Sequence, residues 1–145
     1  MEFDVDSPNP QVGKFLKSLM PSMIDQLALT NSRRAVLVKV TDDDTDLEEG
    51  MHGATLNIEI ADCYLVLIKR PKKVTKASLL EVALTLAHEM VHVRQLAKGQ
   101  MKFLPNQNRI WMGKRYTSKT HYLDQPWEID AFSRQEILLR RAIEK

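Results

Sequence analysis

The stretch Ser78–Lys98, with the sequence SLLEVALTLAHEMVHVRQLAK, carries the clearest secondary-structure signal in the chain. Its apolar residues recur at helical spacing. Ser78 and Glu81 have the pattern of a capping box at the start, and Gly99 directly follows the stretch, as is typical of a helix end. The sequence therefore predicts a helix here, and the rest of the fold is interpreted outward from it.

This helix contains His88, Glu89 and His92 in the pattern H-E-x-x-H. Residues four apart lie on one helix face, so both imidazoles can bind the same metal ion. Zinc suits nitrogen ligands at about 2.0–2.1 Å. Glu89 is rotated about 100° from His88, beside the ion rather than on it. In that place it can act as a general base toward water.

A catalytic zinc needs a third protein ligand, and the candidates downstream are His121, Asp124, Glu128 and Asp130. Glu128 is preferred because the first turn of a helix favours a carboxylate. Asp124 is better placed as a helix cap, and Asp130 lies about 200° around the helix from Glu128. His121 stays the alternative ligand, because imidazole also suits zinc.

The H-E-x-x-H motif followed by Pro126–Ala131, sequence PWEIDA, resembles a minimal gluzincin-type member of the zincin superfamily. The chain is similar to small bacterial and phage metallopeptidase-like proteins, and more distantly to SprT-like proteases. This resemblance covers roughly residues 54–135. It implies His88, His92 and Glu128 as zinc ligands, Glu89 as catalytic base, and zinc-dependent peptide hydrolysis by an endopeptidase of narrow specificity. It also leads us to expect that Asp130 supports the histidines.

The oxyanion of the tetrahedral intermediate would need a hydrogen-bond donor. Tyr116, His121 and Tyr122 are the candidates that the sequence offers near the predicted ligand helix. We assign Tyr116 and Tyr122 to the catalytic group on this basis. An edge strand beside the metal helix, against which an extended substrate pairs, would complete such a site.

The remaining elements predict an α+β fold, in which a small antiparallel sheet packs on the metal-binding helix and a C-terminal ligand helix. Residues 1–10 are expected to be loose, and residues 11–29 to form a helix interrupted or kinked at Pro21. Strands are expected at residues 35–40, 55–60 and 64–69, with Leu56, Ile58 and Ile60 facing inward. Residues 100–123 are expected to be mostly loop. A last helix, capped by Asp124, is expected to run to about Ile143 and to bury Ile129, Phe132, Ile137 and Leu138.

Charge is divided along the chain. Residues 1–62 carry 5 Lys/Arg and 12 Asp/Glu, including an acidic run over residues 42–49, whereas residues 63–145 carry 16 and 7. The run does not match an EF-hand calcium loop. The basic half leaves an alternative function open, a zincin-like protein that binds nucleic acid or a protease that acts on DNA-bound proteins. Its cations are Lys114, Arg115, Lys119, Arg134, Arg140 and Arg141.

The length of 145 residues predicts one domain over residues 1–145. No apolar run approaches the roughly 18 residues of a membrane span, and the acidic start does not resemble a signal peptide. The single cysteine, Cys63, excludes an intrachain disulfide. These features predict a cytoplasmic protein with no membrane partner. The resemblance to zincins implies a protein or peptide substrate.

Overall fold

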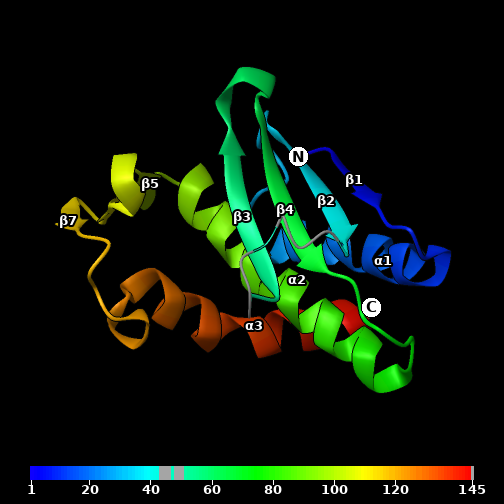
Figure 1. Ribbon diagram of the computed structural model, residues 1–145. Helices are drawn as coiled ribbons and strands as arrows, with labels where there is room; N and C mark the ends of the chain where they lie inside the picture. Colours follow the sequence, from blue (N-terminus) through cyan, green and yellow to red (C-terminus); the bar gives the residue numbers. More distant parts are fainter. Residues whose placement is uncertain (43–46, 48–50, 145) are drawn as a thin grey trace.

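Four strands form the main sheet in the computed structural model, which describes residues 1–42, 47 and 51–144. The strands are β1 (Phe3–Asp6), β2 (Ala35–Thr41), β4 (Cys63–Lys69) and β3 (Gly53–Ile58), in that spatial order. β2 is parallel to both β1 and β4, and only β3 is antiparallel to its neighbour β4. The sheet is therefore mixed, and the expectation of an antiparallel sheet is wrong (Figure 1).

The parallel pairing originates in the N-terminal segment, which was expected to be loose. β1 is followed by helix α1 (Pro10–Gln26), and the chain then returns as β2 beside β1. Such a crossover is the usual way to make two consecutive strands parallel. Phe3 and Val5 pack against the core, but two apolar residues in four are too few to signal a strand. Pro21 lies inside α1 without ending it.

Helices α1, α2 (Lys76–Ala97) and α3 (Pro126–Glu144) pack against each other and contact the sheet through α1 and α2. Alternate residues of the central strands point into this core, because successive side chains of a strand face opposite sides. These residues are Val36, Val38 and Val40 of β2 and Tyr64, Val66 and Ile68 of β4. The core thus fixes α2 beneath the sheet and next to edge strand β3.

The start of α2 differs from the expected capping box. Thr75 is the N-cap residue, and its hydroxyl accepts a hydrogen bond from the Ser78 N–H at 3.0 Å. The Ser78 hydroxyl in turn accepts from the Thr75 N–H at 2.8 Å. Ser78 is therefore at position N3, the last residue of the box, rather than the first. The predicted end is confirmed, since Gly99 takes a left-handed φ of +72° immediately after the helix.

Helix α3 buries a different face from the one expected. Leu138 is buried, but Ile129 and Phe132 are 55% and 50% exposed, and Ile137 is also exposed. The buried positions are Trp127, Glu128, Ala131, Leu138, Leu139 and Ala142. The carbonyl of Gln125 accepts from two N–H groups of the first turn, so Gln125 takes the position before the helix that was assigned to Asp124. The buried stripe of α3 therefore includes a carboxylate, Glu128.

The orientation of β3 also differs from the expected one. Leu56 is 41% exposed and Ile60 is fully exposed, although both were expected to face inward. The strand ends at Ile58, and Ile60 lies in the 3₁₀ turn η1 (Glu59–Ala61). Thr55, one position away from Leu56, faces helix α2 instead.

Residues 100–123 are more ordered than a loop. They contain a three-stranded antiparallel sheet of β5 (Met101–Phe103), β6 (Arg109–Trp111) and β7 (Lys114–Tyr116). The 3₁₀ turns η2 (Pro105–Gln107) and η3 (Tyr122–Asp124) complete the segment. Strands of three residues are too short to show a period of two in sequence. In Figure 1 this small sheet lies beyond the C-terminal end of α2.

Most of the acidic run at residues 42–49 falls outside the described residues. Within the part of the chain that is described, none of the helices has the length and apolarity needed to cross a membrane.

Candidate metal centre

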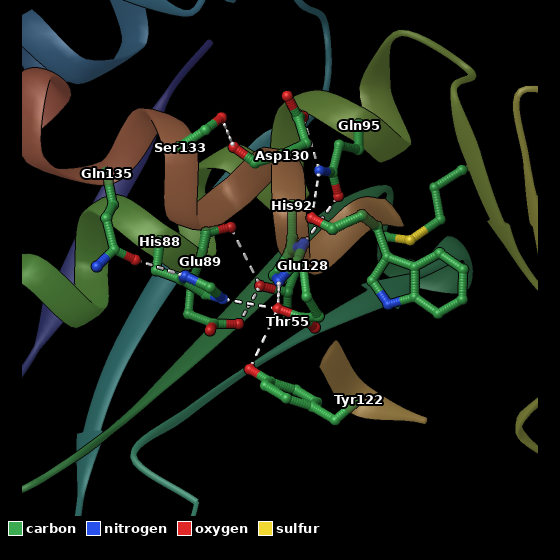
Figure 2. A network of polar contacts seen from close by, with 12 residues as sticks. Thr55, His88, Glu89, His92, Gln95, Tyr122, Glu128, Asp130, Ser133 and Gln135 are labelled. Atoms are coloured by element: carbon green, nitrogen blue, oxygen red, sulfur yellow. Dashed lines mark hydrogen bonds and ion pairs between the residues drawn. The ribbon is translucent and has the colours of Figure 1, made fainter. Parts of the chain in front are cut away.

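Three potential metal ligands converge at the interface of α2 and α3. Oε1 of Glu128 lies 2.8 Å from Nε2 of His88 and 3.0 Å from Nε2 of His92. All three residues are buried, with 9% or less of their surface exposed to solvent. Their ligand atoms lie within 4.8 Å of one another. Figure 2 shows the two imidazoles and the carboxylate pointing toward one another. The helices place His88 and His92 one turn apart, and α3 supplies Glu128 from its first turn.

The donor set fits a divalent metal ion. Zinc bonds of about 2.0–2.1 Å at tetrahedral angles separate neighbouring ligand atoms by about 3.3 Å. The observed separations of 2.8 and 3.0 Å need to open only slightly to reach that value. Two nitrogens and one carboxylate oxygen also leave one position of a four-coordinate ion for water or substrate. The group could therefore hold a metal ion, and its chemistry does not by itself identify which one.

Gln95 fixes the ring orientation of His92. Its Nε2 donates at 2.9 Å both to the Trp127 carbonyl and to Oδ2 of Asp130, which can only accept. The Gln95 oxygen must then face His92, where it lies 2.8 Å from Nδ1. An amide oxygen only accepts, so His92 carries a proton on Nδ1 and its Nε2 is directed at Glu128.

His88 has the same kind of support from the other helix. Oε1 of Gln135 lies 2.7 Å from Nδ1 of His88. The ring also contacts Phe132, with the ring centroids 4.6 Å apart. Outer partners of this type orient metal-binding imidazoles and raise their affinity.

Asp130 was expected to support the histidines directly, but it acts one step further away. It accepts from Gln95 through Oδ2 and from Nε of Arg134 through Oδ1, at 2.9 and 2.7 Å. Neither histidine forms a hydrogen bond with Asp130 within the described part of the chain, since their Nδ1 atoms face Gln135 and Gln95. A glutamine therefore occupies the place beside His92 where an acid was expected.

Glu89 lies outside the triad formed by His88, His92 and Glu128, and it faces β3. The Thr55 hydroxyl donates to Oε1 of Glu89 at 2.9 Å. Burial raises the pKa of the Glu89 carboxyl, and this effect outweighs the opposing influence of His92 and His88. A carboxylate with a raised pKa is a stronger proton acceptor once it is ionised.

The triad shows mutually dependent protonation. Burial alone would raise the pKa of Glu128, but hydrogen bonds from His88 and His92 hold it well below its usual value. Burial alone would lower the pKa of His92, but its hydrogen bond to Glu128 and the charge of Glu89 raise it. His92 therefore tends to keep a proton on Nε2 facing Glu128 when both groups are free of metal.

The two tyrosines assigned to catalysis lie in different places. The Tyr122 hydroxyl is 3.4 Å from Oε1 of Glu128, at the wall of the cleft above the triad. Burial and the nearby carboxylates raise the pKa of Tyr122 to about 12, so it stays protonated near neutral pH. Tyr116 instead packs edge-on against Trp127, with ring centroids 5.5 Å apart. The structure thus brings Tyr122 to the triad and uses Tyr116 in packing.

His121, the alternative ligand, does not join the triad. Its Nδ1 accepts a hydrogen bond from the Leu123 N–H at 3.2 Å, and the side chain is exposed at the start of η3. The potential metal-binding group found among the described residues contains His88, His92 and Glu128 only.

Two clefts flank the triad and share His88, Glu89, Tyr122 and the start of β3. The first, about 680 Å³, extends along α2 toward its N-terminus past Leu84 and Phe132. The second, about 540 Å³, extends toward the small sheet β5–β7 and includes Arg109.

Sequence reasoning missed four residues of this site: Thr55, Gln95, Arg109 and Gln135. Gln95 could have been found, because it follows His92 by three positions and such residues share a helix face. Gln135 lies two turns after Glu128 on α3, so it also shares a face with the predicted ligand. Thr55 and Arg109 reach the site only through tertiary packing.

Comparison of the chain with protein-family models, with curated proteins and with solved structures finds no match. The site itself is therefore the basis for any functional conclusion.

Proposed function

We propose that this protein is a metal-dependent hydrolase that cleaves peptide bonds, with zinc as the metal. One observation carries the proposal: Oε1 of Glu128 lies within hydrogen-bond distance of both Nε2 atoms of the H-E-x-x-H motif. Since Glu89 is not in the triad, it stays available as a base beside the ion.

A zinc ion in this site would polarise the scissile carbonyl and lower the pKa of a water molecule. His88, His92 and Glu128 would hold the ion, and Gln135 and Gln95 hold the imidazole rings in position. Glu89 takes a proton from the attacking water and passes it to the leaving amine. Burial helps, because it raises the pKa of Glu89 toward the range in which a carboxylate exchanges protons efficiently.

Edge strand β3 supports an extended peptide substrate. It is one of the two edge strands of the main sheet, and one side of it can therefore offer backbone groups to another strand. Residues Gly53–Leu56 of β3 line the cleft above the triad. A substrate paired with them passes over the metal centre, with Thr55 keeping Glu89 beside the strand.

Tyr122 is the group we assign to oxyanion stabilisation. Its hydroxyl lies on the cleft side of Glu128 and stays protonated, as a hydrogen-bond donor must. Removing one such donor in other hydrolases lowers turnover by about 100- to 1000-fold.

The test measures metal content and hydrolysis together. Purified wild-type protein should hold about one zinc per chain and cleave an unfolded protein substrate. Glu89→Gln should retain the zinc and lose hydrolysis, because a base and not a ligand is removed. Glu136→Gln, at an exposed position of α3, is the matched control. Absence of any transition metal from protein prepared without chelator would refute the proposal.

Nucleic-acid binding is the second candidate, because Lys114, Arg115 and Lys119 are exposed next to the cleft residues Thr117 and Ser118. Arg134 contributes less, since it pairs with Asp130. Binding to DNA should weaken as salt increases, and should weaken further when the three exposed cations are replaced by alanine. Salt-independent or absent binding would leave hydrolysis as the sole function proposed.

A further inference from the structure

Arg109 occupies an unusual environment in the second cleft. Strand β6 places it in the same cleft as Glu89, His92 and Glu128. Its guanidinium lies over the rings of Phe103 and Trp127, at 4.9 and 5.0 Å from their centroids. The only side-chain acceptor that it contacts among the described residues is the sulfur of Met101, at 3.6 Å.

Three other arginines of the described chain form the ion pair that Arg109 lacks. Arg34, Arg70 and Arg134 each lie within 3.3 Å of an aspartate oxygen. No such ion pair forms at Arg109 within the described residues. Burial lowers the pKa of Arg109, because a charged group that leaves water is destabilised unless a partner compensates. A guanidinium presents five N–H donors, and a thioether is a weak acceptor. Most of the hydrogen-bonding capacity of Arg109 is therefore unused.

The carboxylates of the metal centre do not fill this capacity. Glu89 and Glu128 act on Arg109 through their charges, but neither forms an ion pair with it. One oxygen of each carboxylate has another partner, since Oε1 of Glu89 accepts from Thr55 and Oε1 of Glu128 faces the two histidines. A second donor is unused nearby: Nε1 of Trp127 is buried and has no hydrogen-bond partner in the described structure.

We propose that Arg109 is a specificity-determining residue that binds a carboxylate of the substrate. The inference rests on the proposed function, since it assumes that a peptide occupies the cleft. A guanidinium stacked on aromatic rings is held in a fixed plane, which suits a two-pronged contact with a carboxylate. The carboxylate belongs either to an acidic side chain or to the C-terminus of the peptide.

The direction of β3 determines which of the two carboxylates, a side chain or the C-terminus, a bound peptide can bring to Arg109. Gly53 lines both clefts, whereas Ala54, Thr55 and Leu56 line only the one with Arg109. β3 thus runs from the first cleft toward Arg109. A peptide antiparallel to β3 brings its N-terminal half to Arg109 and offers only side-chain carboxylates there. A peptide parallel to β3 can also offer its C-terminal carboxylate.

The experiment uses zinc-loaded Glu89→Gln protein, which should bind peptides without cleaving them. The protein is immobilised and exposed to three pools of short randomised peptides. The first pool has free C-termini, the second has C-terminal amides, and the third has amides and contains neither Asp nor Glu. Retained peptides are identified by mass spectrometry, and the best are measured by fluorescence anisotropy.

If Arg109 binds an acidic side chain, acidic peptides from the second pool, which have C-terminal amides, should be retained. If Arg109 binds the C-terminus, only peptides from the first pool, which have free C-termini, should be retained. Arg109→Met, which keeps the apolar contacts, should weaken their binding about 10- to 100-fold. Arg109→Lys keeps the charge and should weaken it less. Arg33→Met, at an exposed position before β2, is the control for net charge and should change little. Thermal unfolding of each variant establishes that the fold is intact.

The third pool offers no carboxylate, so its retention at the level of the other two pools would overturn the proposal for Arg109. Equally tight peptide binding with and without the Arg109→Met substitution would also overturn it. Hydrolysis by the wild-type protein separates this result from the proposed function. Cleavage without preference for acidic peptides removes the role of Arg109 and keeps the hydrolase. Arg109-dependent binding without cleavage by the wild-type protein keeps the carboxylate site and removes the hydrolase.

Discussion

The side-chain oxygen of Gln95 lies 2.8 Å from Nδ1 of His92, and both residues belong to helix α2. Gln95 is fully buried, and its nitrogen is held by two acceptors from α3. The amide therefore cannot rotate without losing several hydrogen bonds. This makes Gln95 the residue that decides which nitrogen of His92 faces the metal centre.

Replacing Gln95 with leucine should lower metal affinity by about 10- to 100-fold, which is the usual cost of losing an outer partner of a ligand histidine. The variant places an apolar side chain in the buried position and retains all three proposed ligands. Affinity is measured by competition with a chromogenic chelator. Gln11→Leu, exposed on α1, is the control. Unchanged affinity in Gln95→Leu would show that the ring of His92 is oriented by other contacts.

Glu128→Ala should weaken metal binding by more than that, because it removes a proposed ligand rather than its support. His121→Ala should leave the affinity nearly unchanged, since His121 bonds to the backbone of Leu123 and lies outside the triad. Elemental analysis after dialysis distinguishes the two variants. The opposite ranking would make His121 the third ligand and would exclude Glu128.

Metal affinity should rise as the pH increases from about 6 to about 8, because metal binding requires imidazole nitrogens without protons. The pKa of His92 is raised, so its Nε2 proton persists above the ordinary histidine range. In the metal-free protein the interaction of His92 with Glu128 stabilises the fold below that range and is lost as the pH rises through the raised pKa. The increase in Tm caused by zinc should therefore be larger at the higher pH, as measured by calorimetry. A smaller increase at high pH would contradict this protonation scheme.

Gly53→Ala should separate β3 from helix α2. A Cβ at this position would lie 2.7 Å from Cγ2 of Thr85 and 3.1 Å from Cγ of Glu89. Overpacking of this kind costs about 1–3 kcal/mol of unfolding free energy. Turnover should fall while zinc content stays normal, because the displaced groups are Glu89 and the strand rather than the ligands.

The double variant Gly53→Ala/Thr85→Ser tests the cause. Serine lacks the Cγ2 atom that makes the closest contact, so the double variant should regain part of the lost stability. Denaturant unfolding measures both variants. Equal loss in the single and double variants would place the strain elsewhere.

Local patterns were sufficient to predict that His88, His92 and Glu128 meet, because the position of each side chain depends on a short stretch of chain. The spacing of His88 and His92 on a helix and the first-turn position of Glu128 follow from helical periodicity. The sheet was harder to predict, since the pairing of β1 with β2 joins segments about 30 residues apart and leaves no periodic signal. The face of α3 was misjudged for a related reason. Its apolar residues Ile129 and Phe132 are exposed, while the polar Glu128 is buried by the histidines that it contacts.

Arg109 could not be predicted at all from its own neighbourhood in sequence. It reaches the cleft because the antiparallel pairing of β6 with β5 and β7 folds the segment back toward Trp127. No spacing rule relates Arg109 to the motif on α2. Contacts of this kind depend on tertiary structure and not on any local pattern.

The division of the triad between α2 and α3 has a mechanical consequence. His92 and Glu128 are separated by 36 positions, and the whole β5–β7 segment lies between them. An ion bound by both helices would act as a removable cross-link at the two ends of the segment between His92 and Glu128. It would reduce the conformational entropy of the state in which this segment is unfolded, as loop closure does. A chelator should then release the β5–β7 segment before the main sheet opens. Hydrogen exchange in β6 and β7 would rise while that of β2 and β4 stays slow, so the same ion would serve both the chemistry and the closure of the cleft wall that carries Arg109.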